Sequence, residues 1–300
     1  MKPTFLILGV GRSGTTSLAD NLADHPDVFL SNPKEPWFFD GPRYEERDLD
    51  WYWDEYYSEW SGEGAVGEAS SHSLFVPHVA DRLRADLPDA RLMAILRHPV
   101  DRAYSHWWMN RYFGMEGLSF DDAVRENLER LERGEDFCGE DGKRRWYDYV
   151  TAYQEGELRY RCYVDMGHYA EQIGRYTARF PESHLRVLLL SDLRRDPAST
   201  YRELFEFLGV DPEAWKGEAA RRNERYESRF VYRITNLATR TRIQYLVPRP
   251  VRRWIGGVLR RTGSAPEMSP GARQRLLVHY EPHVRRLEAL LDRDLSRWRS

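Results

Sequence analysis

A glycine-rich loop near the start of the chain has the composition of an anion-binding site. Gly9 and Gly14 show the G-x-x-x-x-G spacing of a phosphate-binding loop, and the apolar run before them predicts a buried strand. Nucleotide triphosphatases continue with a Lys and then a Ser or Thr, whereas this chain has Thr15 and Thr16. A cation, Arg12, lies inside the loop instead. We therefore predict a cradle of backbone N–H groups for a phosphate-like anion, but not an ATP site.

A second set of residues could bind another phosphate. Arg97 follows the apolar run 92–96, which predicts a buried strand, and Pro99 suits the first turn of a helix that begins at once. Open α/β sheets place their ligands at this end of a strand. Ser105 follows about two helical turns later, so its hydroxyl can point toward the start of the helix. A guanidinium fork and a hydroxyl suit a phosphate; the alternative is an Arg at a strand edge and a Ser on a solvated helix face.

A carboxylate that could act as a base follows the first expected helix and the short strand 28–30. Glu35 stands next to Lys34, between two prolines and ahead of the aromatic run 37–39. Prolines stiffen the backbone, and aromatic rings can bury the surroundings of a carboxylate. The alternative is a solvated charge pair at the tip of a loop.

Together these segments resemble the sulfotransferases that use 3′-phosphoadenosine 5′-phosphosulfate (PAPS), in particular the bacterial and heparan-sulfate-type enzymes. The loop of that family reads Lys/Arg-x-Gly-Thr-Thr/Arg, and Arg12 to Thr16 match it. The family binds the 3′-phosphate with an Arg and a Ser at the spacing of Arg97 and Ser105. The family also has a Glu that acts as the catalytic base ahead of a Phe-Phe-Asp-like stretch, and Glu35 stands at this position.

The resemblance implies transfer of a sulfo group from PAPS to a hydroxyl or amine of a small-molecule, glycan or lipid acceptor, with no metal. The implied catalytic residues are Glu35 as base, with Arg12 and Lys34 as cations. The chain departs from the heparan-type enzymes at Ala69, where they have a Lys. The implied PAPS-binding residues are Gly11, Arg12, Ser13, Gly14, Thr15, Thr16, Ser17, Arg97 and Ser105.

Two other functions stay open at this point. A P-loop kinase of a small molecule would use a related fold, but Thr15 stands where such an enzyme needs Lys. A catalytically silent nucleotide-binding protein would account for Arg12 and Ala69 in place of lysines. Protection against heating by ATP and magnesium is what the kinase hypothesis requires.

Composition narrows the class of protein. The 45 basic and 48 acidic side chains give a net charge of −3, which does not favour nucleic acid as a partner. Cys138 and Cys162 cannot build a disulfide framework and fit a reducing compartment. The first strand begins too early to leave room for a signal peptide, and no apolar run reaches the ~20 residues that span a bilayer. We expect a cytoplasmic protein without a transmembrane segment; the oligomeric state stays open.

Strands and helices alternate along the chain, which predicts an α/β fold of the P-loop type: a three-layer α/β/α domain with a central parallel sheet. A mobile loop is expected at 136–143. The expected strands are 5–8, 28–30, 65–67, 91–96 and 184–190. The expected helices are 15–25, 49–60, 72–87, 99–113, 119–133, 167–179, 201–208 and 271–298.

We expect one domain over 1–300, with an unusual subregion near its end. The resemblance covers 1–215 well and 266–300 through the terminal helix, whereas 216–265 diverges. Between Arg221 and Thr262 there are twelve Arg, no Lys and two Glu, interleaved with apolar residues. This stretch could meet an anionic glycan or a lipid headgroup at a membrane surface; a solvated helical pair explains it equally well.

Two further sites are less defined. The family closes a Lys/Arg-Gly loop over the adenine, and in its absence Arg222, Asn223 and Arg225 are the candidate substitutes. We find no cluster of His or Cys residues with the spacing of metal ligands. His168, beside Tyr169, is a candidate for the acceptor site.

Overall fold

The structure is a computed structural model of the 300-residue chain and describes residues 2–216 and 267–300. Five strands form one sheet in the order β2-β3-β1-β4-β5, and each neighbouring pair is parallel. The predicted α/β fold with a central parallel sheet is confirmed. The strands are β1 (Phe5–Gly9), β2 (Val28–Leu30), β3 (Ala65–Ala69), β4 (Arg91–Leu96) and β5 (Leu185–Leu189).

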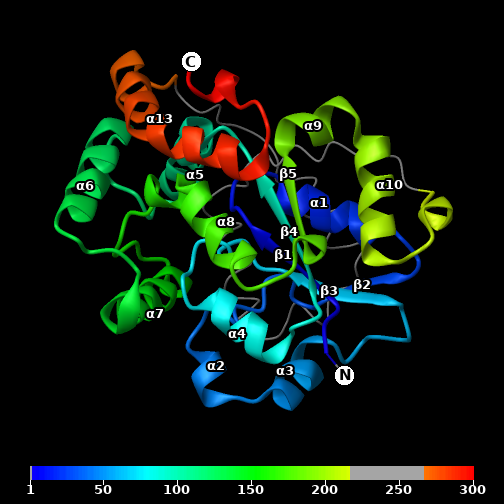
Figure 1. The fold of residues 1–300 in the computed structure, drawn as a ribbon. Coiled ribbons are helices and arrows are strands. Elements are labelled where there is room, and N and C mark those ends of the chain that lie inside the picture. Colours follow the sequence, from blue (N-terminus) through cyan, green and yellow to red (C-terminus); the bar gives the residue numbers. More distant parts are fainter. Residues whose placement is uncertain (1, 217–266) are drawn as a thin grey trace.

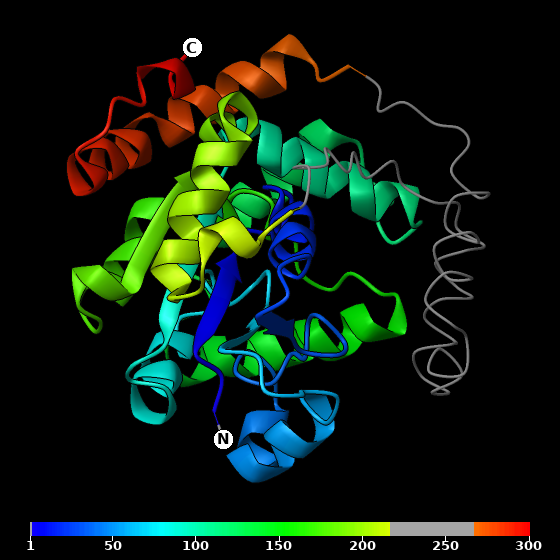
Figure 2. The same cartoon turned by 90° about the vertical axis from the view of Figure 1, so that its right-hand side faces the viewer.

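Helices cover both faces of the sheet, which makes it the middle of three layers (Figure 1). Turned by 90°, the molecule shows α9 and α10 in front of the sheet, with α13 above (Figure 2). The helices are α1 (Thr15–Leu22), α2 (Arg43–Glu46), α3 (Leu49–Tyr56), α4 (Val79–Asp86), α5 (Pro99–Tyr112), α6 (Phe120–Glu132), α7 (Gly139–Glu155), α8 (Tyr169–Thr177), α9 (Leu190–Arg195), α10 (Pro197–Leu208) and α13 (Pro270–Leu291).

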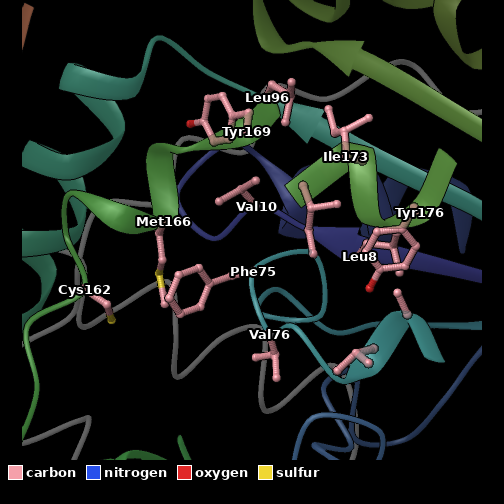
Figure 3. Packing of buried hydrophobic residues seen from close by; sticks show 14 of the residues in the cluster. Leu8, Val10, Phe75, Val76, Leu96, Cys162, Met166, Tyr169, Ile173 and Tyr176 are labelled. Carbon is pink, nitrogen blue, oxygen red and sulfur yellow. The ribbon is translucent and has the colours of Figure 1, made fainter. Parts of the chain in front are cut away.

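The core lies on both sides of the sheet because alternate strand residues face opposite helical layers. Phe5 and Ile7 of β1 pack with side chains of α1, α9 and α10 in one buried cluster. Leu6 and Leu8 belong to the other cluster, with side chains of α4, α5 and α8. Figure 3 shows part of this second cluster, including Tyr176 of α8. Burial on both faces explains why β1 is an unbroken apolar run.

The helix predicted over 72–87 is wrong at its start, since α4 begins at Val79. The residues before it form turns. Pro77 accounts for this, because proline lacks an N–H and disfavours helical backbone in the residue before it. Leu74 is nevertheless a core residue, and its N–H donates to the carbonyl of Leu8 at 2.7 Å. The apolar spacing therefore predicted correctly that Leu74 is buried, but wrongly that it lies in a helix.

The mobile loop predicted over 136–143 is wrong in its second half, because α7 begins at Gly139. Glu140 and Asp141 occupy the first turn, where the positive end of the helix dipole favours carboxylates. Trp146, two turns into the helix, is fully buried and holds the helix against the core. The charges that suggested a loop form the exposed face of this helix.

The terminal helix is shorter than predicted. It ends at Leu291 rather than Trp298, because Asp292 adopts a left-handed conformation with φ 48°. None of the described helices combines the length and apolarity that a membrane crossing needs. The Arg-rich stretch between Arg221 and Thr262 lies outside the described residues. Within the described residues, both core clusters pack against the same sheet. The assignment of 1–300 to one domain stays a prediction.

Candidate active site

The glycine-rich loop joins β1 to α1 at the carboxyl edge of the sheet. Neighbouring segments hold its first half: the N–H of Val10 donates to Ile95 of β4 at 3.1 Å, and that of Gly11 donates to the carbonyl of Ser71 at 3.0 Å. Arg12 and Gly14 have positive φ values of 74° and 100°, which turn the chain into the helix. The loop is thus built on the ends of two adjacent strands.

The second half of the loop presents backbone donors. In the described part of the chain, the N–H groups of Gly14, Thr15 and Thr16 have no acceptor. These groups surround the start of α1, where the helix dipole also favours negative charge. The cradle therefore fits a phosphate or phosphosulfate. Ser13 is 0% exposed, and its N–H donates to Val10 within the loop, so it supports the cradle from behind.

Gly9 is required by the approach of the loop to Ser71. Its φ is 127°, and a Cβ at this position would lie 2.5 Å from the carbonyl oxygen of Ser71. We expect Gly9→Ala to lower the free energy of unfolding by about 2–4 kcal/mol, from overpacking and backbone strain together. Urea unfolding would measure this. Gly174→Ala in α8 is the matched control, because its Cβ would meet nothing within 4 Å and alanine should be neutral or stabilising. Equal stability of the two variants would contradict the prediction.

The predicted 3′-phosphate residues lie beside the loop. Arg97 follows β4, and its Nη1 donates to the carbonyl of Arg12 at 3.3 Å. Arg12 Nε in turn donates to Ser105 Oγ at 3.2 Å, so the structure brings these three residues together. Tyr169 donates its hydroxyl to the carbonyl of Arg97 at 3.0 Å and holds it from the other side. Nothing in the sequence motifs pointed to this tyrosine.

The charge around Arg97 favours an anion. Burial lowers the pKa of Arg97 below its usual value; Asp101 opposes this shift, and the cations Arg194 and Arg12 add to it. A guanidinium keeps its proton in proteins, so Arg97 stays positively charged. The lowered pKa indicates that water and Asp101 only partly compensate this buried charge. A phosphate placed here would compensate it.

Lys34 and Glu35 lie on the opposite side of the start of α1. Lys34 Nζ donates to Thr16 Oγ1 at 2.8 Å and lies 3.7 Å from Glu35 Oε1. Ser71, which sequence reasoning missed, donates its hydroxyl to Glu35 Oε2 at 3.2 Å. Both charged side chains keep 27% of their surface exposed, so a substrate can reach them.

The segment that carries this pair continues from β2 along the edge of β3. Ser31 donates its N–H to Gly67 at 2.8 Å, and Ala69 donates its N–H to the carbonyl of Lys34 at 3.2 Å. Lys34 is therefore directly beside the position where the heparan-type enzymes have their lysine. Its ammonium supplies a cation in this part of the site although residue 69 is alanine.

A buried carboxyl lies behind the pair, at an inward position of β3. Glu68 is 0% exposed and accepts hydrogen bonds from the hydroxyls of Tyr52 at 2.5 Å and Ser70 at 2.8 Å. Burial raises the pKa of Glu68 to about 7, and these two hydrogen bonds oppose part of the shift. Burial and the charges of Glu68 and Glu35 likewise raise the pKa of Asp40 to about 8. The sequence prediction missed Glu68, because the expected strand 65–67 ends before it, whereas β3 continues to Ala69.

Glu68 makes stability depend on pH. Its carboxyl keeps its proton in the folded chain between its ordinary pKa of 4.5 and about 7, whereas the unfolded chain has lost it. Glu68 alone should therefore lower the free energy of unfolding as the pH rises through this window, by at most on the order of 3 kcal/mol, in addition to the fall that Asp40 causes. Glu68→Gln should make the decline shallower, with Asp40 retaining part of it. Thermal midpoints between pH 5 and 8 would test this, with exposed Glu206→Gln as control; parallel curves for all three proteins would refute it.

The remaining residues predicted for the site either line the first turn of α1, lie away from the loop, or fall outside the described residues. Thr15 is buried, whereas Thr16 and Ser17 are partly exposed on the first turn of α1. His168, the candidate for the acceptor site, lies against α13 instead, with His279 and His283. Arg222, Asn223 and Arg225 lie outside the described residues.

Comparisons with known proteins address the fold and the site together. The profile of the sulfotransferase domain matches residues 2–230. The bifunctional heparan sulfate N-deacetylase/N-sulfotransferase 2 of Bos taurus is 29% identical over 221 residues, which cover 70% of this chain and 22% of that protein. The N-deacetylase/N-sulfotransferase 4 of Mus musculus is 32% identical over 218 residues, with the same coverage. This chain thus spans about a fifth of the length of these relatives.

A solved structure is similar over the whole length. The crystal structure of a sulfotransferase from Alicyclobacillus acidocaldarius has a TM-score of 0.69 and 29% sequence identity, and the match covers 100% of both chains. The fold of this chain therefore has a counterpart in a solved sulfotransferase.

Proposed function

The chain belongs to the sulfotransferase domain family, and from this premise we propose that it transfers a sulfo group from PAPS to a hydroxyl or amine of an acceptor. Membership of the family implies PAPS as the donor. One observation carries the assignment to particular residues: the start of α1 has Arg97, Arg12 and Ser105 on one side, and Lys34 and Glu35 on the other. Two anion sites and a base thus flank one helix N-terminus.

We propose that the donor is held at both of its phosphate ends. Arg97 and Ser105 would bind the 3′-phosphate, which ATP lacks. The loop Gly11–Ser17 would bind the 5′-phosphosulfate through the N–H groups of Gly14, Thr15 and Thr16 and the hydroxyls at the start of α1. The donor chemistry of these residues fits an anion at each end.

In the transfer step, Glu35 would take the proton of the acceptor hydroxyl or amine as that atom bonds to sulfur. The bond between sulfur and the bridging phosphate oxygen breaks, and this oxygen keeps the electron pair. Lys34 is suited to stabilise the resulting charge because it touches both Thr16 of the cradle and Glu35. Arg12, whose side chain turns toward Ser105, would contribute charge from the donor side. These cations supply the neutralisation that a metal provides in kinases, so the proposal includes no metal.

The acceptor is a small molecule, glycan or lipid in this proposal. A glycan is supported by the names of the relatives, which are enzymes of heparan sulfate. The Arg-rich stretch between Arg221 and Thr262 would meet an anionic acceptor or a membrane surface. A cytoplasmic location stays a prediction.

Ligand-dependent unfolding tests the donor assignment. The product 3′-phosphoadenosine 5′-phosphate (PAP) should raise the thermal midpoint, since a ligand at about 100 times its Kd stabilises by ~2.7 kcal/mol. ADP should have a smaller effect, and ATP with magnesium should have none beyond that of ADP. Stabilisation by ATP and magnesium instead of PAP would favour a kinase. A response to PAP without sulfo transfer to any acceptor in a panel that includes glycans with free amines would favour a silent binding protein.

A further inference from the structure

Three histidines that are far apart in sequence meet where the start of α8 packs against α13. One ring nitrogen from each of His168, His279 and His283 lies within 4.8 Å of the other two. The Nε2 atoms of His168 and His279 are 2.8 Å apart, and the rings of His168 and His283 are stacked with centroids 3.9 Å apart. All three side chains are half-buried. None of them has a role in the proposed transfer.

The packing of α13 brings the rings together. His279 and His283 are four residues apart and so share one face of this helix. Tyr280 anchors the helix, because its buried hydroxyl donates to the carbonyl of Val164 at 2.7 Å. At Gly167, next to His168, an added Cβ would lie 2.6 Å from the Tyr280 hydroxyl. The backbone therefore approaches α13 as closely as a glycine permits, and in Figure 1 α13 crosses over α8.

A carboxylate orients one of the rings from outside. Glu171 of α8 lies with Oε1 3.0 Å from His283 Nδ1, and Arg286 Nη2 is 2.6 Å from the same carboxylate oxygen. Arg286 Nη2 also lies 3.0 Å from His283 Nδ1. Because Nδ1 of His283 is engaged by Glu171 and Arg286, Nε2 is the nitrogen left for a ligand. Histidines that bind metals usually have such a partner on their other nitrogen. The rings of His168 and His283 are parallel, so one of them has to rotate for both to point at the same ion.

We propose that His168, His279 and His283 form a binding site for a divalent transition-metal ion of the Zn²⁺ class, which ties α13 to α8. Neutral imidazoles are preferred ligands of Zn²⁺, Cu²⁺ and Ni²⁺. Three protein ligands with water in the fourth position are the usual arrangement of catalytic zinc, and the three histidines supply that number of ligands. The ion would replace the single proton that His168 and His279 share in their hydrogen bond. The site would also fix Tyr169, the neighbour of His168 that holds the carbonyl of Arg97.

Direct titration with Zn²⁺ and Co²⁺ tests the proposal without any activity assay. The full-length chain is used with Cys138→Ser, because the Cys138 thiol is exposed and could bind metal itself. We expect one ion per chain, with Co²⁺ giving the intense visible absorption of a tetrahedral complex. His279→Ala should lose binding, and His184→Gln, outside the cluster, should retain it. Absence of saturable binding, or equal affinity in the His279 variant, would overturn the site.

Two more variants separate metal binding from a purely structural role. His168→Cys keeps a zinc ligand but removes the hydrogen bond to His279, so it should bind Zn²⁺ where His168→Ala does not. Glu171→Gln keeps all three ligands and should weaken binding by ~10–100-fold, the usual loss when an outer partner is removed. If His168→Cys and His168→Ala behave alike, the cluster is a hydrogen-bonded core of the helix pair and the proposal fails. This result would leave the sulfotransferase assignment untouched.

Discussion

Glu35→Gln is expected to lower kcat for sulfo transfer by ~10²–10⁴-fold, the usual contribution of a general base. Glutamine has the shape of the carboxylate and can still accept a hydrogen bond from Ser71, but it cannot take a proton from the acceptor. Lys34 keeps its bond to Thr16, so the cradle should stay intact. Single-turnover transfer from PAPS, with a PAP titration of the same protein, would separate the chemical step from donor binding.

Glu46→Gln is a matched control for that experiment, because Glu46 is exposed on α2. Its kcat and PAP affinity should equal those of the unchanged chain. Undiminished kcat in Glu35→Gln would remove Glu35 as the base while leaving the family assignment in place. A loss of PAP affinity as large as the loss of kcat would show that Glu35 acts by supporting the loop.

Arg97→Ala is expected to weaken PAP binding by at least ~30-fold and to abolish the preference for PAP over ADP. Truncating one partner of a buried, hydrogen-bonded charge pair typically costs ~2–5 kcal/mol. ADP has no 3′-phosphate, so its affinity should change little. Arg97→Lys should recover part of the loss, since it restores the charge but not the guanidinium fork. Calorimetric titration with both nucleotides measures the two affinities.

The ADP measurement also detects an indirect effect, because Arg97 donates to the carbonyl of Arg12. If Arg97→Ala weakened the binding of ADP and of PAP equally, Arg97 would support the loop rather than bind the 3′-phosphate. Arg144→Ala, on the exposed face of α7, controls for the loss of one positive charge and should bind both ligands normally.

The edge of the sheet was predictable for a physical reason. Parallel strands end on the same side, so the loop after β1 and Arg97 after β4 had to be neighbours once these strands paired. The two apolar runs and the prolines and glycines next to them identified those strand ends. Lys34 and Glu35 could be placed near the same edge only through the family resemblance, since β2 is three residues long and carries little signal.

Contacts that depend on the packing of distant helices could not be predicted. Tyr169 reaches Arg97 from α8, and His168 meets His279 across more than a hundred residues. Local charge was also misleading at α7, where an acidic first turn resembled a loop. Glu68 was also missed, because the expected strand stopped at residue 67 and its partner Tyr52 comes from a helix.

The residues assigned to the two phosphate ends of the donor and to proton transfer lie between Gly11 and Ser105, about the first third of the chain, whereas the candidates for the adenine, Arg222, Asn223 and Arg225, come later. Later segments, such as α8 with Tyr169, brace this part from outside. This separation predicts that changes in the later two thirds of the chain leave the chemistry of sulfo transfer in place as long as the contacts to the first third are kept. A chimera that joined residues 1–105 to the rest of another family member should therefore still transfer a sulfo group from PAPS. We expect this only where the second parent also has a tyrosine at the position of Tyr169, whose hydroxyl holds the carbonyl of Arg97.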